Sequence, residues 1–587
     1  MSEQKNLIIA IAISVAILFG FQFFFGTSEL AKKHPATPAQ TAAPAKTGMA
    51  GAPATAPATE VAPGGNGAGA SFAGGTSGLS PQALPAALAR SGRVKIDNGT
   101  VSGSISLEGA RIDHLRLLDY HETVSNKSPV ITLLEPPGSP HPYYASFGWT
   151  DNAGNKIALP GPNTKWQSSG GALSADHPVT LTWDNGQGLR FAMVFSIDKD
   201  YMFHIEEKVE NQTGQPVTLF PYGLIARDGT PKTLGYYLLH EGPLGVFNDR
   251  LSEYKYKTLK DDGSIRKSTT GGWIGITDKY WLAALIPDQK IPVTANFRYA
   301  AGGPYKNRYQ VDYLGGAVTV PAHGAAASSA RFFAGAKETQ LLNYYAKHDH
   351  VERFDLAIDW GWFYFLTKPI FYALDYLNSV LGNFGLAILA LTTLIKLVFF
   401  PLAQKSYRAM TEMKRLQPRI AEIREQYADD RNKMNQEVME LYKRAKINPA
   451  AGCLPVLLQV PVFFALYKVL FVTIEMRHAP FYGWIHDLSA PDPTTVFNLF
   501  GLIPWTPPHI LEIGAWPLMM GASMFLQQRL NPAPADPMQA KLFMLMPIFF
   551  TYLLAHFPAG LVIYWTWNNL LSLTQQWLIM RRMGVKA

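Results

Sequence analysis

The segment that decides the fold class spans residues 383–402 and reads NFGLAILALTTLIKLVFFPL. Its length is about that of a helix crossing the ~30 Å hydrocarbon core of a bilayer, and its only charge is Lys396. A lysine near the bilayer centre costs about 2.5–3.5 kcal/mol, so we expect its ammonium group to face protein or water. The alternative is that Lys396 snorkels to the membrane boundary, which Pro401 places five residues away. The segment predicts a membrane protein with a candidate functional cation inside one span.

Several other segments are apolar over a similar length. Residues 1–28 are predicted to be an uncleaved signal anchor, because their apolar run is longer than the ~7–15 residues of a cleaved signal peptide. Residues 352–381 place Lys368 and Asp375 on a different helical face from the apolar residues, which predicts an amphipathic helix in the membrane interface. Residues 382–587 are predicted to form a helical membrane domain with five spans. The predicted spans number six: 7–26, 383–402, 453–474, 510–528, 541–557 and 559–580.

A linker and a β-rich domain separate the first span from the others. Residues 29–92 are predicted to be a flexible linker, because 35 of the 56 positions between 35 and 90 are Ala, Pro or Gly. Between residues 93 and 340 the apolar period becomes two, and the segment 189–197, LRFAMVFSI, alternates apolar and other residues throughout. Three dipeptides supply turns: Asn98-Gly99, Asn185-Gly186 and Asp262-Gly263. This pattern predicts an antiparallel β-sandwich of roughly 240 residues.

The sequence contains no recognisable catalytic or metal-binding motif. A single cysteine rules out a disulfide framework and a thiolate metal cluster. There is no Gly-x-Ser-x-Gly elbow, His-Glu-x-x-His or phosphate loop. Glu206, Glu207 and Asp228 could form an acid–base pair, but a solvated sheet face explains them more simply. We therefore predict no catalytic residue, no metal site and no cofactor, and a protein that is not an enzyme.

The distribution of positive charge predicts the orientation in the membrane. Residues 404–450 contain eleven Lys or Arg, whereas the loop 475–509 contains only Arg477. The positive-inside rule places 404–450 and both termini in the cytoplasm, with the sandwich and the 475–509 loop outside. Residues 404–450 read as a helical hairpin, equally compatible with a solvated helix pair and with a surface that docks an anionic partner. The candidate docking residues are basic: Arg415, Arg419, Arg424, Arg431 and Lys433.

The last predicted span carries a polar stripe. Tyr564, Asn568, Ser572 and Gln575 recur at helical spacing, and Trp565 lies beside them. Thr392, one turn before Lys396, and Gln459 in the third span add uncharged polar groups. Such residues can simply bond neighbouring helices, but together with a lone cation they describe a hydrated groove. Because the span cores contain no Asp or Glu, we favour a passive polar groove over a proton or cation pathway.

Several separate motifs resemble those of the YidC family, the membrane protein insertases of bacteria, which are related to mitochondrial and chloroplast insertases. The resemblance runs essentially end to end and is strongest at Asn448–Pro455, NPAAGCLP, and continues through QVPVF at 459–463. Shorter matches follow the family order: DWGW at 359–362, FPL at 400–402, DPMQ at 536–539 and FPAGL at 557–561.

The resemblance implies a mechanism, a location and a set of partners. Family members hold a water-containing groove with a single arginine, whose position is taken here by Lys396; a lysine keeps the charge but loses the planar guanidinium fork. The sandwich, with its Gly272-Trp273, looks like the family's periplasmic domain, whose fold is similar to sugar-mutarotase supersandwiches. The implied partners are nascent membrane proteins, the ribosome, the Sec translocon and the lipid bilayer of the inner membrane, with no small-molecule substrate. The predicted groove residues are Lys396, Thr392, Gln459, Tyr564, Trp565, Asn568 and Ser572.

Two other functions fit the same sequence less well. A solute or ion transporter would be expected to carry an intramembrane carboxylate and an inverted repeat, and neither is evident. A membrane-anchored periplasmic sugar-binding or sugar-modifying protein would use the spans only as an anchor. The expected fold is thus a multi-domain membrane protein: an all-β supersandwich periplasmic domain, and an α-helical bundle of six transmembrane helices with a cytoplasmic helical hairpin.

Overall fold

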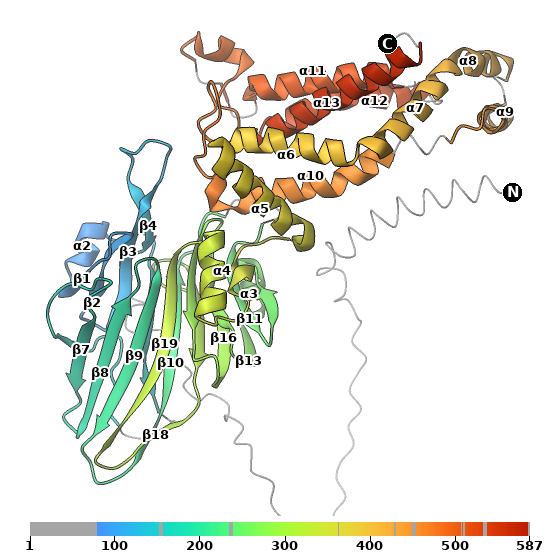
Figure 1. The fold of residues 1–587 in the computed structure, drawn as a ribbon. Helices are drawn as coiled ribbons and strands as arrows, with labels where there is room; N and C mark the ends of the chain where they lie inside the picture. The colour runs from blue at the N-terminus through green and yellow to red at the C-terminus, as the bar shows by residue number, and fades with distance from the viewer. Residues whose placement is uncertain are drawn as a thin grey trace, which may run out of the picture. The chain divides into compact units, whose positions relative to one another are not determined.

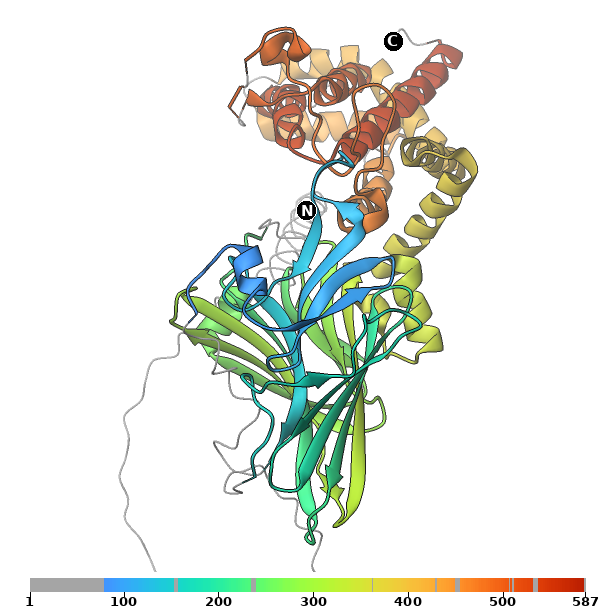
Figure 2. The same ribbon diagram turned by 90° about the vertical axis from the view of Figure 1, so that its left-hand side faces the viewer.

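The structure is a computed structural model of the 587-residue chain. It describes residues 79–151, 157–233, 239–361, 363–427, 430–448, 454–505, 507–508, 511–531 and 537–584. The predicted signal anchor and most of the predicted linker lie outside these residues, as do 449–453 of the NPAAGCLP motif. All described residues belong to one compact unit. Strands fill the first part of it and helices the second (Figures 1 and 2).

Residues 93–336 form two antiparallel sheets that share one core. The first sheet has the order β1-β2-β3-β5-β10-β17-β16-β13, with β4 on β3 and β18 on β10. Its strands are β1 (Arg93–Asp97), β2 (Val101–Ser106), β3 (Arg111–His121), β4 (Val130–Leu134), β5 (Tyr143–Thr150), β10 (Val217–Asp228), β13 (Ser264–Thr270), β16 (Pro292–Ala301), β17 (Asn307–Leu314) and β18 (Val318–Val320).

The second sheet has the order β12-β11-β14-β15-β19-β9-β8-β7-β6. Its strands are β6 (Gln167–Ser168), β7 (Val179–Asp184), β8 (Leu189–Ile197), β9 (Met202–Asn211), β11 (Gly242–Phe247), β12 (Arg250–Glu253), β14 (Trp273–Thr277), β15 (Trp281–Ile286) and β19 (Gly324–Ala336). The alternation predicted for 189–197 is confirmed, because every second residue of β8 is buried. Between the sheets, the rings of Phe147 and Phe332 meet edge to face with centroids 6.1 Å apart.

The structure differs from the sequence-based expectation at several points in the sandwich. The pairing of β2 with β3 shifts register between Ser104 and Ile105, so a bulge in β2 interrupts the period of two predicted for 93–340. Asp262-Gly263 does not join two strands but ends a short helix, α3 (Tyr256–Asp262), with Gly263 at φ 74°. A five-residue helix, α2 (Leu84–Leu88), lies within the predicted linker.

The solvated sheet face predicted for three carboxylates holds for Glu206, whose side chain is 46% exposed, but is wrong for Glu207 and Asp228. Glu207 is fully buried and Asp228 is 7% exposed. Asp228 is neutralised by Arg308, whose Nε lies 2.6 Å from Oδ1. Neither carboxylate oxygen of Glu207 has a hydrogen-bond partner in the structure. The sequence pattern failed here because β9 places Glu207 on the inward side of the strand, between buried Ile205 and Val209.

The second part of the chain is helical. Helix α13 packs against α6, α7 and α11, and α10 packs against α5 (Figure 1). The helices are α4 (Thr339–His348), α5 (Tyr364–Leu381), α6 (Phe384–Val398), α7 (Phe400–Arg415), α8 (Gln417–Gln426), α9 (Arg431–Arg444), α10 (Leu454–Val472), α11 (Ala515–Leu530), α12 (Pro537–Leu554) and α13 (Ala559–Arg582), with short 3-10 turns η1 (Phe354–Ala357), η3 (Ile474–Met476) and η4 (Val496–Gly501).

Helices α6 and α7 are separated by a sharp bend. By length and hydropathy no single described helix meets the criteria for a membrane span, but α6 and α7 meet them together across a 70° bend. The helix predicted over 383–402 therefore ends at Val398, and α7 begins at Phe400. Pro401 in the first turn of α7 explains the break, because proline lacks an N–H and disfavours helical geometry in the residue before it.

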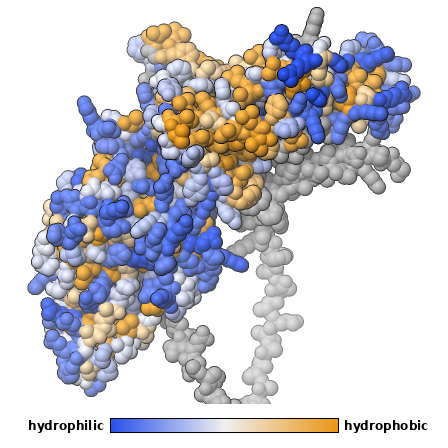
Figure 3. Space-filling model, in the orientation of Figure 1, coloured by the Kyte–Doolittle hydropathy of each residue, from blue (hydrophilic) through white to orange (hydrophobic). Residues whose placement is uncertain are grey.

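The helical part exposes large apolar side chains. On α6, Leu397 is 62% exposed and Val398 is 74% exposed; on α12, Ile548 is 69% exposed and Phe549 is 60% exposed. Figure 3 shows hydrophobic residues gathered over the helices, whereas the strands carry mostly hydrophilic residues on the same face of the molecule. Contiguous exposed apolar surface of this kind marks contact with a membrane or a protein partner.

Candidate functional site

Lys396 lies near the C-terminal end of α6 and is half-buried. Its Nζ donates a hydrogen bond to Oγ of Ser572 in α13 over 2.8 Å. The Ser572 hydroxyl in turn donates to the main-chain oxygen of Asn568 over 2.8 Å. Among the described residues, no carboxylate forms an ion pair with Lys396. An ammonium group has three donors, so Lys396 retains hydrogen-bonding capacity for water or a ligand.

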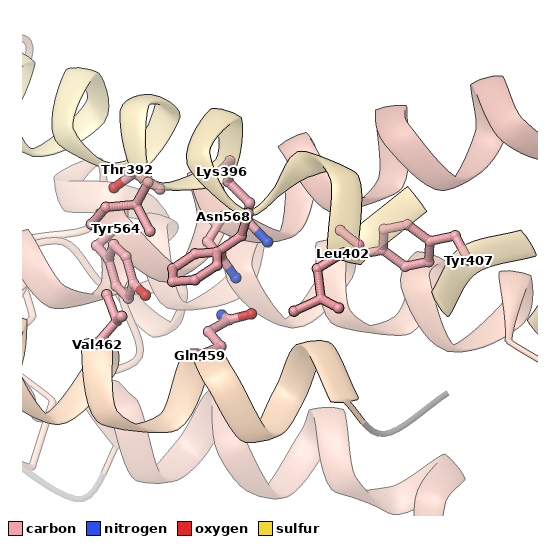
Figure 4. A pocket seen from close by; sticks show the side chains of 11 residues that line it. Thr392, Lys396, Leu402, Tyr407, Gln459, Val462, Tyr564 and Asn568 are labelled. Carbon is pink, nitrogen blue, oxygen red and sulfur yellow. The ribbon is translucent and has the colours of Figure 1, made fainter. Parts of the chain in front are cut away.

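A small cavity opens beside Lys396, and polar groups from four helices meet in it (Figure 4). Its volume is about 50 Å³, which is room for a few water molecules at ~10–15 Å³ each. The hydroxyl of Tyr564 in α13 is hydrogen-bonded to Gln459 in α10, so the polar groups connect opposite walls. The lining residues are Thr392, Ile395, Lys396, Phe399, Leu402, Ala403, Tyr407, Gln459, Val462, Tyr564 and Asn568. We call this cavity the groove.

The helical period of α13 explains why its polar residues reach the groove together. Tyr564, Asn568 and Ser572 follow one another at intervals of four residues and are all buried. Their stripe faces α6, against which α13 packs. On a neighbouring face, Asn569 donates to Ser523 Oγ of α11 over 3.0 Å. The structure thus brings to the groove Lys396 and most of the polar residues singled out in the sequence.

Ser572 is not among the lining residues, although it accepts the hydrogen bond from Lys396; Trp565 is the other predicted groove residue that does not line this cavity. Its ring packs against Phe463 of α10 at 4.7 Å and against Phe550 of α12 at 5.9 Å. Thr392 lines the cavity, but its hydroxyl donates to the main-chain oxygen of Ile388 over 2.7 Å. The Thr392 hydroxyl proton is therefore already used within α6, and the side chain serves mainly as part of the cavity wall.

Sequence reasoning missed the part of the site that α7 supplies. Leu402, Ala403 and Tyr407 line the groove because α7 turns by 70° after Phe399. The side chain of Tyr407 is hydrogen-bonded to Ser572, the same hydroxyl that receives the bond from Lys396. Residues from 404 onward had been assigned to a cytoplasmic hairpin, and no local signal at Tyr407 distinguishes a groove residue from a hairpin residue.

The predicted docking residues do not form a uniform surface. Arg415 donates to the main-chain oxygen of Met583, Arg419 pairs with Glu422 at 3.5 Å, and the Lys433 ammonium lies 5.3 Å from the Tyr427 ring centroid. Arg424 is half-buried on α8, which packs against α9; the side chain of Arg431 lies outside the described part of the structure. No group of three or more potential metal ligands occurs among the described residues.

Comparison with known proteins identifies the family. The family model of the YidC periplasmic domain matches residues 93–373, and that of the 60Kd inner membrane protein matches 376–586. A membrane protein insertase YidC from Methylorubrum extorquens is 50% identical over 603 aligned residues, covering 100% of this chain and 96% of the relative. The chain belongs to the YidC family of membrane protein insertases.

Other YidC proteins show the same relationship. The YidC of Beijerinckia indica is also 50% identical, over 100% of this chain and 97% of the relative. A crystal structure described as an active YidC insertase with its first transmembrane domain resolved is 16% identical and has a TM-score of 0.34, covering 85% of this chain and 95% of that chain. A galactose mutarotase related enzyme from Lactobacillus acidophilus has a TM-score of 0.30, covering 41% of this chain and 97% of its own. Both TM-scores are low, so the assignment to the YidC family rests on sequence.

Proposed function

We propose that this chain inserts nascent membrane proteins into the bacterial inner membrane through the groove around Lys396. The observation that carries the proposal is the environment of that ammonium group. It faces a cavity that Gln459, Tyr564 and Asn568 also line, its described hydrogen bond is to a hydroxyl, and no described carboxylate neutralises it. A hydrophilic segment crossing a bilayer would leave each polar group unsatisfied at a cost of several kcal/mol. Water, amide and hydroxyl groups in the groove lower that cost, and the positive charge attracts acidic residues of the substrate.

A substrate segment would enter the groove by moving apart the helices that line it. A cavity of about 50 Å³ holds water but not a peptide segment, so the groove must widen when a substrate enters. Trp565 packs against Phe463 of α10 and Phe550 of α12, and α13 carries it one residue after the groove-lining Tyr564. In this mechanism the apolar helix of the substrate leaves past these aromatic contacts. Hydrophobic partitioning drives the exit, and no nucleotide is hydrolysed.

The proposed orientation follows the charge distribution. The five helices α6, α10, α11, α12 and α13, together with the N-terminal segment 7–26, would make six spans with both termini in the cytoplasm. The basic helices α8 and α9 would form the cytoplasmic hairpin that receives the ribosome or nascent chain, and the Sec translocon would be a partner in the membrane. Helix α5, with Phe365 and Tyr376 exposed, would lie in the membrane interface.

Substitution of Lys396 tests the electrostatic role. We expect Lys396→Arg to retain insertion of a single-span substrate into proteoliposomes. Lys396→Ala should lower the rate about fivefold, because ~1 kcal/mol of charge stabilisation is lost. Lys396→Glu should lower it further, because it repels acidic segments. Lys267→Ala, which removes an exposed charge on β13 of the sandwich, serves as the control. Glu at position 396 working as well as Arg would refute the proposal.

Access of water to the groove is a separate test. After replacement of the single cysteine, Cys453, we expect Thr392→Cys to react with silver ion, a thiol reagent close to water in size, added to the cytoplasmic side of proteoliposomes. Leu545→Cys, on the exposed apolar face of α12, should stay unlabelled and is the control. Equal lack of reaction at both positions would show that the groove is dry at rest.

A further inference from the structure

A second, larger cavity lies on the other side of α6 from the groove. Its volume is about 510 Å³, within the ~300–1,000 Å³ range of small-molecule pockets. It runs between α6–α7 and the C-terminal half of α13, and only Lys396 lines both cavities. The lining residues are Thr393, Lys396, Leu397, Phe400, Gln404, Arg408, Glu412, Leu571, Thr574, Gln575, Leu578, Ile579, Arg582 and Met583.

The wall of this cavity changes from apolar to charged along its length. The apolar end contains Leu397 and Phe400, which precede the charged residues of α7, and Leu571 and Leu578, which precede Arg582 on α13. Leu397, Phe400 and Leu578 are exposed, as expected of a wall open to lipid. Figures 1 and 3 share one orientation. In Figure 3, hydrophobic residues cover the middle of the helices, and hydrophilic residues gather near the C-terminal end of α13.

The charged end has an excess of unpaired positive charge. Arg408 and Arg582 are exposed and, within the described part of the chain, neither guanidinium has an ion pair or hydrogen bond. Counted over the whole cavity, Lys396, which directly precedes Leu397, adds a third cation, against the single carboxylate of Glu412. Between the two ends, Nε2 of Gln575 is buried and has no hydrogen-bond partner among the residues that the structure describes, although an amide N–H normally has one.

We propose that this cavity binds an anionic phospholipid of the cytoplasmic leaflet. The phosphate lies between Arg408 and Arg582, and one acyl chain follows Leu397, Phe400, Leu571 and Leu578. Charge complementarity favours an anionic over a zwitterionic headgroup. An apolar wall favours a lipid over a peptide, whose main chain would find few partners there. The assignment to this leaflet rests on the orientation under the proposed function.

Native mass spectrometry of the full chain tests this site directly. The delipidated protein in detergent is incubated with phosphatidylglycerol or with phosphatidylcholine of identical acyl chains. We expect phosphatidylglycerol to be retained preferentially, and the double variant Arg408→Gln/Arg582→Gln to retain at least about fivefold less of it. The control, Arg190→Gln/Arg250→Gln, removes two exposed arginines of the sandwich, outside the cavity, and should bind as the wild type does.

A variant of the apolar end keeps both arginines. Thr574 is exposed, and Thr574→Trp would fill the space beside Leu571 and Leu578; we expect it also to lower phosphatidylglycerol retention. Inorganic phosphate should not displace the lipid, because the acyl chain contributes to binding. Equal retention of the two lipids, undiminished retention by the arginine variant or by Thr574→Trp, or displacement by phosphate would each overturn the proposal. Lipid retention is measured without insertion, so failure of the site and failure of the insertase mechanism are distinguishable.

Discussion

At the scale of single residues, the carboxyl group of Glu207 is buried in the core of the sandwich without a charged or hydrogen-bonded partner among the described residues. Glu207 is fully buried in β9 and both its oxygens lack hydrogen-bond partners, so burial raises its pKa well above the ordinary value. The titratable groups that sense its charge are Tyr222 and Tyr313, which are themselves neutral because burial raises their pKa. Glu207 therefore holds a proton in the folded protein at pH values where the unfolded chain has lost it.

This difference predicts a pH-dependent stability. The pKa of Glu207 is higher in the folded protein than in the unfolded chain. Its contribution to the free energy of unfolding is therefore fully present below the unfolded pKa near 4.5 and is lost as the pH rises toward the folded pKa. The free energy of unfolding should fall by about 1.4 kcal/mol per pH unit in that window relative to Glu207→Gln, which does not titrate. Thermal unfolding of the full chain in detergent, followed by circular dichroism between about pH 5 and pH 8, measures this slope. Parallel pH profiles for the two proteins would contradict it.

At the scale of elements, one carboxylate connects three segments. Asp359, in the DWGW motif, accepts from Lys468 Nζ of α10 at 2.8 Å and from the main-chain N–H groups of His240 and Gly361 at 3.1 Å each. The side chains of Asp359 and Lys468 are 19% and 13% exposed. A pair so withdrawn from water is screened far less than a surface salt bridge.

A double-mutant cycle measures the strength of this connection. Lys468→Met should destabilise the chain by about 1–3 kcal/mol, because it leaves the Asp359 carboxylate without its countercharge. Combining it with Asp359→Asn should cost less than the sum of the two single changes, with a coupling of ~0.5–3 kcal/mol in denaturant unfolding. Lys443→Met, an exposed lysine of α9, is the control and should change stability little. If the destabilisations of the two single variants simply add in the double variant, the Asp359–Lys468 pair contributes no coupling free energy to stability.

At the scale of the whole molecule, the groove and the sandwich are built from separate parts of the chain. The residues that line the groove come from α6, α7, α10 and α13, with Phe399 at the bend between α6 and α7. The described contacts between this part of the chain and the sandwich involve none of the groove-lining residues. Arg477 donates to the main-chain oxygen of His121 over 2.5 Å and lies against the rings of Tyr280 and Trp281, and the Lys279 ammonium lies 4.0 Å from the Phe471 ring centroid. The insertion machinery should therefore work without the sandwich.

Deletion of residues 93–336 tests this division. We expect the shortened chain to insert a single-span substrate within about twofold of the full chain, because the groove keeps all its lining residues. Helical circular dichroism confirms that the remaining helices fold. Loss of insertion with intact helices would place the essential surface in the sandwich.

The sequence by itself determined the features that depend on a regular spacing of residues within one strand or one helix. The alternation in β8 and the stripe of Tyr564, Asn568 and Ser572 on α13 are periodic, so each residue's environment follows from its neighbours in the chain. Lys396 stood out for the same reason, as the one charge in a segment that is otherwise apolar.

Only the tertiary structure decided which elements meet. The 70° bend after Phe399 brings Tyr407 to the groove, and packing of α13 turns Trp565 toward Phe463 and Phe550 instead. Glu207, read as a solvated residue, lies in the core because the facing sheet covers it. These outcomes depend on contacts between residues far apart in the chain, whose packing free energy no local pattern records.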